Sequence, residues 1–261
     1  MNFPLYQVDA FTDKAFGGNP ACVVPLEQWL PDDLLQRIAQ ENAVAETAFF
    51  VPDRDGFHLR WFTPELEMDL CGHATLATAH VLKTELGFHG LEVSFSSRSG
   101  MLKVFMQDHR YVLDFPSRMP LPSSLPTLIA EALNIQPLEV LKSRDYVLVY
   151  ASEAQVRDIK VDRVLFDRIN LDPGGVIVTA KGENCDFVSR FFTPQSSILE
   201  DPVTGSAHCS LIPYWSARLG KKDMEAWQVS DRLGKLYCSD RGERVLIGGE
   251  AVTFSVGTIR I

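Results

Sequence analysis

The 261-residue chain is long enough for one large domain or two ordinary ones, and its 46% hydrophobic content supplies a sizeable core. Asp and Glu (34) outnumber Lys and Arg (25), and the net charge of −9 argues against a nucleic-acid or anionic-membrane surface. We find no signal-peptide pattern and no run approaching the ~20 apolar residues that span a bilayer. We therefore expect a cytoplasmic protein whose partner is a small molecule.

The cysteine count and the motif search point away from metals and cofactors. The five cysteines are odd in number, scattered and free of any Cys-x-x-Cys pair, which fits reduced thiols rather than a disulfide framework or a zinc site. The chain also has no dinucleotide-binding glycine fingerprint, no phosphate-binding loop and no His-Glu-x-x-His. We expect chemistry by side chains alone, with no metal and no cofactor.

Strand signals dominate the first part of the chain. A glycine-rich loop, Gly17-Gly18-Asn19-Pro20, separates the first two β-prone runs. An apolar helix over 74–86 lacks a wide polar face, which predicts burial near the middle of its half. The other expected elements are strands at 3–11, 21–25, 47–51 and 59–63, a helix at 31–41, and a β meander at 93–95, 101–106 and 111–115.

A proline-rich stretch divides the chain. Residues 116–126 contain four prolines, which break helices and remove strand donors, so we expect domains at 1–117 and 118–261. Whether the last strand, at 251–261, returns to the first half is left open. The second half has a capping box at Ser152-x-x-Gln155, strands at 146–150, 176–179 and 186–192, and helices at 128–133 and 206–219, the last closed by Gly220.

One pattern occurs twice. Trp61-Phe62-Thr63-Pro64 runs through Glu67 and Asp69 to Cys71-Gly72-His73-Ala74, and Phe191-Phe192-Thr193-Pro194 runs through Glu200 and Asp201 to Gly205-Ser206-Ala207. The offsets are 193 − 63 = 130 and 205 − 72 = 133, about half the chain. A repeat of this period indicates two copies of one ancestral half rather than a solenoid. We predict an α+β fold of two pseudo-symmetric β-rich halves, each wrapped around a central helix, with a cleft between them.

Both copies begin their apolar helix with a glycine-led turn, at Gly72 and at Gly205. Free backbone N–H groups and the positive end of a helix dipole favour an anion. The expected ligand is therefore a small carboxylate.

Glu46 is the first candidate for proton transfer. The strand period places it on the face of Ala48 and Phe50, while the opposite face is also mainly apolar. Loss of hydration there would raise the pKa of the carboxyl towards the range of a general acid/base. A strand-end glutamate pointing into water is the equally weighted alternative.

His73 and Asp201 lie at the two turns. The helix N-terminus is expected to lower the pKa of His73 and keep it neutral, so that it orients an acid or donates to substrate. Asp201 is either an ordinary helix cap, worth about 1 kcal/mol, or a cleft residue, and its four-residue separation from Gly205 favours the cleft. His208, beside the second turn, is left undecided.

Cys71 precedes Gly72, where a thiol of lowered pKa could act as a base, as in racemases that use one cysteine on each side of the substrate carbon. The second turn, Pro202-Val203-Thr204-Gly205, has no cysteine. A packing role is therefore favoured for Cys71.

Four segments together resemble the PhzF-like proteins of phenazine biosynthesis, in the expected order over nearly the whole chain. They are Asp9-Ala10-Phe11-Thr12 with Gly17-Gly18-Asn19-Pro20, Ala45-Glu46-Thr47, Leu70-Cys71-Gly72-His73-Ala74-Thr75, and Glu200-Asp201-Pro202-Val203-Thr204-Gly205-Ser206-Ala207.

The resemblance implies a diaminopimelate epimerase-like fold, a homodimer, and a cofactor-independent isomerisation of trans-2,3-dihydro-3-hydroxyanthranilate or a similar compound. It implies that Glu46 is the general acid/base, with His73 and Asp201 as its polar partners. Gly72, Gly205 and Ser206 are implied as donors to the substrate. Two alternatives stay open: an amino-acid epimerase or racemase of the same fold, and a non-catalytic small-molecule binder.

Overall fold

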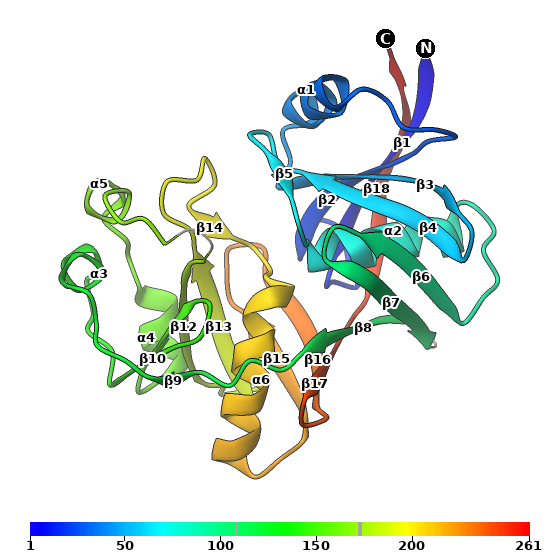
Figure 1. The fold of residues 1–261 in the computed structure, drawn as a ribbon. Coiled ribbons are helices and arrows are strands. Elements are labelled where there is room, and N and C mark those ends of the chain that lie inside the picture. The colour runs from blue at the N-terminus through cyan, green and yellow to red at the C-terminus, as the bar shows by residue number, and fades with distance from the viewer. Residues whose placement is uncertain (108, 172–173) are drawn as a thin grey trace. The chain divides into compact units, whose positions relative to one another are not determined.

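The computed structural model describes residues 1–107, 109–171 and 174–261. It divides into two compact units: unit 1 comprises Met1–Asp114 with Gly248–Ile261, and unit 2 comprises Phe115–Ile247. Each unit combines many strands with few helices (Figure 1), so the fold is α+β, as the sequence predicts. None of the helices in the described part of the chain is long and apolar enough to cross a membrane.

Unit 1 is built around helix α2 (Gly72–Thr84). Eleven of its residues are buried, from Gly72 to Leu82, and it contacts β1, β2, β3, β7 and β18. The burial expected from its lack of a polar face is confirmed, although the helix begins two residues earlier than predicted. The elements of unit 1 are β1 (Asn2–Ala10), β2 (Asn19–Pro25), α1 (Asp32–Asn42), β3 (Glu46–Asp53), β4 (Gly56–Phe62), β5 (Glu67–Met68), α2, β6 (Glu92–Ser97), β7 (Gly100–Gln107), β8 (Arg110–Pro116) and β18 (Ala251–Arg260).

The two ends of the chain meet in unit 1. Strand β18 pairs antiparallel with β1 from Asn2 opposite Arg260 to Ala10 opposite Ala251. Figure 1 shows the N and C labels beside each other at the ends of these strands. The last strand therefore completes the sheet that the first strand begins.

Unit 2 contains the second long apolar helix, α6 (Gly205–Leu219), which ends at Gly220 in the left-handed conformation, as predicted. Its other elements are β9 (Leu121–Pro122), α3 (Thr127–Ala132), β10 (Glu139–Lys142), β11 (Tyr146–Val149), α4 (Glu153–Asp158), α5 (Arg163–Phe166), β12 (Val176–Lys181), β13 (Phe187–Phe192), β14 (Glu200–Asp201), β15 (Asp223–Gln228), β16 (Gly234–Asp240) and β17 (Arg244–Gly249).

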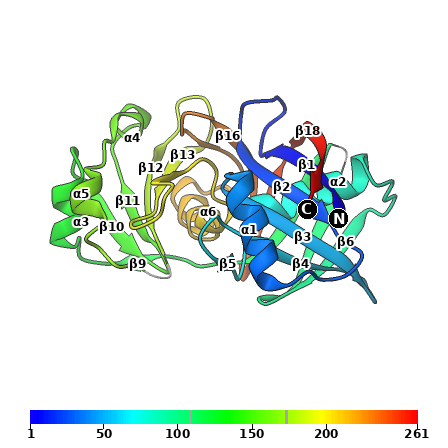
Figure 2. The same ribbon diagram turned by 90° about the horizontal axis from the view of Figure 1, so that it is seen from above.

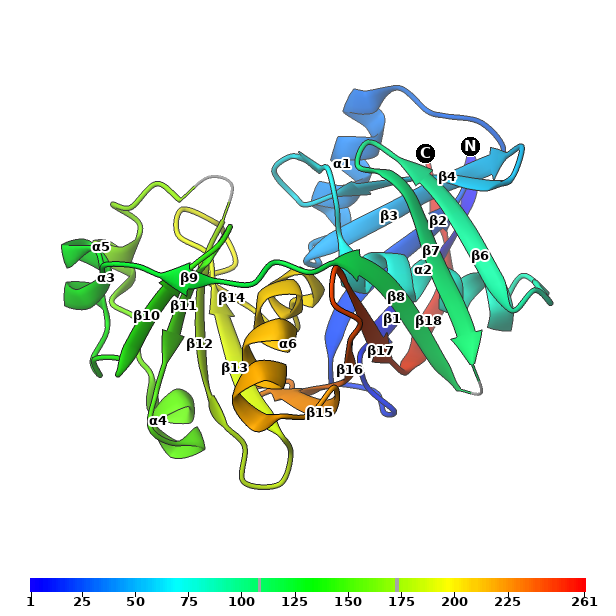
Figure 3. The same cartoon turned by 60° about the horizontal axis from the view of Figure 1, so that its bottom comes forward.

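Helix α6 packs on β12 and β13, which Figure 2 shows beside it in a view almost along the helix axis. The Trp215 indole donates to Thr179 Oγ1 of β12 at 2.9 Å and stacks on Phe187 of β13. Strands β10, β11, β12 and β13 follow one another in the sheet (Figure 3). The capping box predicted at the start of α4 is present, because Ser152 Oγ accepts from the Gln155 amide.

The predicted linker is not wholly irregular. Leu121 and Pro122 form β9, which pairs antiparallel with β10. Proline at a sheet edge needs no ladder donor, so a proline-rich segment can still add a short edge strand.

Corresponding strands of the two units share one register. In unit 1 the adjacent positions across β2, β3, β4 and β5 are Cys22, Thr47, Phe62 and Glu67. In unit 2 the adjacent positions across β11, β12, β13 and β14 are Tyr146, Val176, Phe192 and Glu200. Because the two sets of paired positions match, each residue next to them in one unit can be assigned the residue at the same strand position in the other unit.

The register corrects one detail of the sequence repeat. Glu200 and Glu67 are 200 − 67 = 133 residues apart, as are the first residues of α6 and α2. One residue further along, Asp201 pairs with Phe191 in unit 2, and Met68 pairs with Trp61 in unit 1. The counterpart of Asp201 is therefore Met68, not Asp69, because the second copy has three more residues in the preceding turn.

Candidate active site

Glu46 is the first residue of β3, whose next five residues are buried on both faces of the strand. The Glu46 side chain is 16% exposed. This placement fits the apolar surroundings that the sequence predicts, with the carboxylate at the strand end and its Oε2 buried.

His73 is the second residue of α2, and its side chain is only 4% exposed. Its Nε2 lies 3.1 Å from Glu46 Oε2. Within the described part of the chain, neither atom has a well-aligned hydrogen bond despite this short distance. Buried polar atoms are nearly always satisfied, so two unsatisfied atoms side by side indicate a place where a ligand completes the bonding.

The other ring nitrogen of His73 has two neighbours. Asn19 Nδ2 lies 3.1 Å from His73 Nδ1, and Cys71 Sγ lies 3.5 Å from the same atom. Sequence reasoning assigned Asn19 to a loop and missed it as a site residue. The available signal was a polar amide directly after two glycines in an otherwise apolar region.

The glycine-rich loop explains the position of Asn19. Gly18 has φ +59°, and a Cβ there would lie 2.0 Å from the carbonyl oxygen of Ala10. Only glycine fits this close backbone approach, which brings the fully buried Asn19 to the start of β2.

The surroundings of His73 favour its protonated form, whereas the sequence predicts a neutral ring. Burial lowers the pKa of His73, but the neighbouring Cys71 and Glu46 raise it, and the net pKa lies well above 6.5. Burial, followed by the charge of Glu46, raises the pKa of the Cys71 thiol. Because that thiol keeps its proton, we attribute the raised pKa of His73 to the Glu46 carboxylate.

Glu46, Cys71 and His73 also form a group whose ligand atoms lie within 4.8 Å of one another, so the group could hold a metal ion. Carboxylate, thiolate and imidazole are zinc ligands. The raised pKa of the Cys71 thiol opposes the ionisation that such binding requires.

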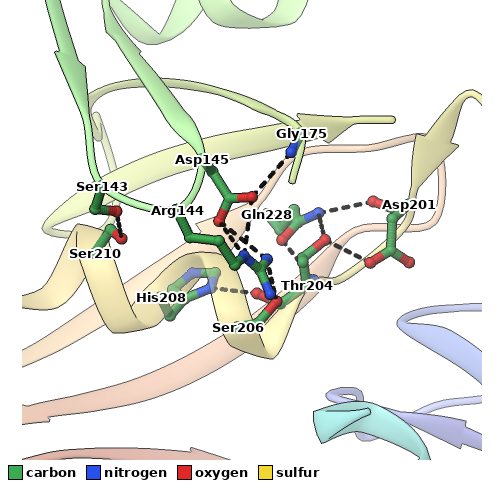
Figure 4. Close-up of polar contacts among 10 residues, drawn as sticks. All are labelled: Ser143, Arg144, Asp145, Gly175, Asp201, Thr204, Ser206, His208, Ser210 and Gln228. Atoms are coloured by element: carbon green, nitrogen blue, oxygen red, sulfur yellow. Dashed lines mark hydrogen bonds and ion pairs between the residues drawn. The ribbon is translucent and has the colours of Figure 1, made fainter. Parts of the chain in front are cut away.

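Asp201, the third predicted catalytic residue, lies at the end of β14 in unit 2 and supports the start of α6 (Figure 4). Its Oδ2 accepts from Thr204 Oγ1 at 2.6 Å, and its backbone carbonyl accepts from Gln228 Nε2 at 2.8 Å. The fully buried Gln228 also accepts from the Thr204 amide at 2.8 Å. Asp201 therefore contacts the cap residue of α6 through its side chain.

Gly205 and Ser206, the predicted substrate donors of unit 2, are the first two residues of α6. Ser206 Oγ accepts a hydrogen bond from Arg144 Nη2 at 3.0 Å, and Arg144 in turn binds the carboxylate of Asp145 (Figure 4). Sequence reasoning missed Arg144, Asp145 and Gln228. Gly72 holds the matching first position of α2, directly before His73.

His208, undecided from sequence, is fully buried in the first turns of α6. Its Nδ1 lies 2.9 Å from the Thr204 carbonyl oxygen, which fits a neutral ring that donates to the helix backbone. Burial lowers the pKa of His208 to about 4, although the bond to Thr204 acts in the opposite direction. These features indicate a structural histidine.

Comparisons with known proteins agree along the whole chain. The family model described as "Phenazine biosynthesis-like protein" matches residues 8–257. An uncharacterized isomerase of Pseudomonas aeruginosa is 49% identical over 262 residues, covering 100% of both chains. The crystal structure of a PhzF family protein from Enterococcus faecalis matches with a TM-score of 0.95, 45% identity and 100% coverage of both chains.

A more distant structure supports the fold alone. A hydroxyproline epimerase from Agrobacterium vitis superposes with a TM-score of 0.63 at 10% identity, over 99% of this chain and 92% of that one. With the family match over nearly the full length and relatives of high identity, the chain belongs to the PhzC–PhzF family of phenazine biosynthesis-like proteins.

Proposed function

We propose that the protein is an isomerase that moves a proton between carbon atoms of a small carboxylate-bearing substrate, with Glu46 as the general acid/base and without a cofactor. Trans-2,3-dihydro-3-hydroxyanthranilate or a compound of similar chemistry is the proposed substrate. The observation that carries this proposal is the 3.1 Å contact between Glu46 Oε2 and His73 Nε2, two atoms without an aligned partner among the described residues.

The proposed reaction has two proton transfers. The Glu46 carboxylate takes a proton from a substrate carbon that is acidified by neighbouring unsaturation, and it returns a proton to another carbon of the same conjugated system. General acid–base catalysis of this kind contributes about 10²–10⁴-fold to a rate. The proton is conserved overall, so the reaction needs neither an oxidant nor a second substrate.

His73 is proposed to hold the Glu46 carboxylate in its reactive orientation. The raised pKa of His73 makes the ring a cation beside the carboxylate at neutral pH, and Asn19 fixes the ring from the opposite side. When Glu46 accepts a proton, the imidazolium is released from that ion pair and becomes available to the substrate.

The remaining predicted site residues keep their proposed roles. Gly72, Gly205 and Ser206 are donors to the substrate through the first-turn N–H groups of α2 and α6, which lack intrahelical partners. Asp201 is a polar partner that acts with Thr204. A homodimer, the proposed assembly, is tested by light scattering of the purified protein.

The two-thiol racemase is the weaker alternative. Cys71 is the cap residue of α2, and the cap residue of α6 in the same position is Thr204. A hydroxyl in place of the second thiol removes the base that such a mechanism needs.

Solvent deuterium incorporation tests the proposal. A panel of cyclic and unsaturated amino acids and hydroxy acids is incubated with the protein in D₂O, and proton NMR follows exchange and isomerisation. Glu46→Gln is expected to lower both rates by roughly 10²-fold or more, because an amide cannot accept and return the proton. Glu41→Gln, an exposed residue of α1, is the matched control and should keep the wild-type rate.

Three results decide between the alternatives. Exchange by Glu46→Gln at the wild-type rate would overturn the role of Glu46. Loss of activity after dialysis against a chelator, with recovery on adding a metal ion, would overturn the cofactor-free reaction. Binding of panel compounds without exchange by the wild type would favour the non-catalytic binder.

A further inference from the structure

Strand β18 lies at the edge of the sheet in unit 1. The pairings run in the order β18–β1–β2–β3, so β1 and β2 each have both sides occupied and β18 stands at the end. Five successive residues of β18, from Phe254 to Thr258, are exposed, whereas a strand covered on one face alternates between buried and exposed residues. The middle of β18 is therefore open to solvent.

The backbone groups of β18 can be assigned to its two sides. The Ile261 amide donates to the Met1 carbonyl at 2.9 Å, so the backbone of Ile261 bonds towards β1. Bonds to one neighbour fall on every second residue of an antiparallel strand, which places those of Gly257 on the same side. The N–H and C=O groups of Val256 and Thr258 therefore point to the outer edge.

The sequence of β18 does little to protect this edge. Natural edge strands are commonly protected from pairing with another chain by proline or by charged side chains, lysine above all. Residues 251–259 contain neither, in a chain where 23% of residues are charged. The register with β1 shifts at Phe254, and such a bulge is another protective device. It leaves the segment 255–260 regularly paired with β1 and open on its other side.

Exposed apolar side chains lie beside this edge. Phe16 is 73% exposed, Phe254 45% and Val256 61%, and the two phenylalanine rings meet edge to face with centroids 5.5 Å apart. Phe16 has φ +71°, which is a strained conformation for a bulky residue, and its amide donates to Oδ2 of the buried Asp9 at 2.8 Å. A strained aromatic residue that is anchored yet exposed is typical of a contact surface.

We infer that β18 pairs antiparallel with β18 of a second copy of this chain, about a two-fold axis at Gly257. Gly257 is the midpoint of the segment between the bulge at Phe254 and the strand end at Arg260. This register places Val256 of each copy opposite Thr258 of the other. The outward N–H and C=O groups of these residues then become paired.

A second copy fits this edge because the pairing is complementary to itself. A two-fold interface brings the same surface of both copies together, and the uncharged residues 251–259 bring no like charges into contact although each copy carries −9. At each end of the pairing, Arg260 of one copy comes opposite the exposed Phe254 ring of the other, where a cation–π attraction is expected.

The inference rests on the proposed assembly, because it names the contact surface of that homodimer. It is independent of proton transfer by Glu46, so assembly and catalysis can be tested separately.

Cysteine cross-linking tests the register on the full chain. Gly257→Cys should form a covalent dimer with glutathione disulfide, because facing residues of a non-hydrogen-bonded antiparallel pair have Cα atoms about 4.5 Å apart, within disulfide range. Nothing lies within 4 Å of a Cβ at Gly257, so the substitution fits the fold. Ser255→Cys is the matched control, since its two copies lie about 13 Å apart along the strands and should not cross-link.

Sedimentation and light scattering of edge variants test the surface. Val256→Lys should weaken dimerisation by about 100-fold or more, because an edge lysine opposes strand pairing. Val256→Pro should act in the same way, because proline removes the outward N–H and keeps the bonds to β1. Val164→Lys, at an exposed valine of unit 2, is the control and should remain dimeric. Thermal unfolding checks that each variant is folded.

Three results would overturn the inference. A monomeric wild type would remove it together with the proposed homodimer. A folded Val256→Lys variant that dimerises as the wild type does would remove this surface and leave the homodimer. Cross-linking of Gly257→Cys no stronger than that of Ser255→Cys would remove the register. Unchanged proton exchange in Glu46→Gln would instead remove the proposed reaction and leave the surface standing, because assembly is measured without substrate.

Discussion

Arg190 of β13 binds both carboxylate oxygens of Glu200 on β14, each at 2.7 Å. Its remaining nitrogen, Nη1, reaches the backbone carbonyls at the end of α4 at 2.9 to 3.1 Å, namely those of Val156, Arg157 and Ile159. The same bidentate contact recurs in unit 1 between Arg60 and Glu67, at 2.7 and 2.8 Å. One guanidinium in each unit therefore fixes the turn that leads to the central helix.

Arg190→Lys is expected to lower the free energy of unfolding by about 2–4 kcal/mol, because a lysine cannot satisfy both the carboxylate and three carbonyls from a 13% exposed position. Urea unfolding measures the change. Arg241→Lys, which alters an exposed ion pair with Asp223, should cost about 0.5 kcal/mol or less. Equal losses in both variants would contradict the role of Arg190.

The buried histidines should titrate at very different pH values. Burial lowers the pKa of both His80 and His208 to about 4, whereas the pKa of His73 lies well above 6.5. NMR of labelled histidine rings should therefore show His73 charged at pH 7 while the other two are neutral. Glu46→Gln should bring the His73 pKa down, because it removes the neighbouring carboxylate. A neutral His73 at pH 6 in the wild type would contradict the ion pair.

Stability should fall as the solution is acidified from about pH 6.5 to pH 4. In this window His80 and His208 take up protons when the chain is unfolded but stay neutral when it is folded, so the unfolded state binds more protons. His80→Gln should flatten the slope of unfolding free energy against pH, because glutamine does not titrate. An unchanged slope in this variant would show that His80 is accessible to protons in the folded protein.

Gly18→Ala should destabilise unit 1 by about 2 kcal/mol or more, since its Cβ would lie 2.0 Å from the Ala10 carbonyl at a positive φ. Gly87→Ala is the matched control, because Gly87 also has a positive φ (+70°) but nothing lies within 4 Å of its Cβ. The difference in unfolding free energy isolates the steric clash. Similar values for both variants would show that the loop at Gly18 relaxes without cost.

Cys71→Ala should retain proton exchange to within about tenfold of the wild type, because its thiol has a raised pKa and supplies no base. The deuterium assay that tests Glu46→Gln measures this rate. A loss as large as that of Glu46→Gln would revive thiol chemistry and the racemase alternative.

Much of the fold could be predicted because it depends on local pattern. The two apolar helices and the strand before each produce periodic signals and a repeat in the sequence. The pairing of β18 with β1 could not be predicted, since nothing in the last ten residues specifies which of several distant strands they join. The two-residue strand β9 is too short to show a period and lies among prolines.

In the candidate site, too, some residues could be predicted from the sequence and others could not. Glu46 and His73 could be singled out because each adjoins a recognisable element start. Arg144 and Asp145 look like a polar turn before a strand, and their relation to Ser206 arises only when β11 pairs with β12 and α6 packs beside them. The raised pKa of His73 could not be predicted either, because it depends on a carboxylate 27 positions earlier in the chain (73 − 46 = 27).

The pairing of the first and last strands has a consequence for synthesis on the ribosome. Unit 2 is one continuous segment, Phe115–Ile247, and all of it has been made before β18 emerges. Unit 1 must wait until β18 has been made, and the edge of β1 that pairs with it stays open until Ala251–Arg260 arrives. Domains generally fold as units and the N-terminal one first during synthesis. In this chain we expect the order to be reversed, so that the later-made unit completes its fold before the earlier one.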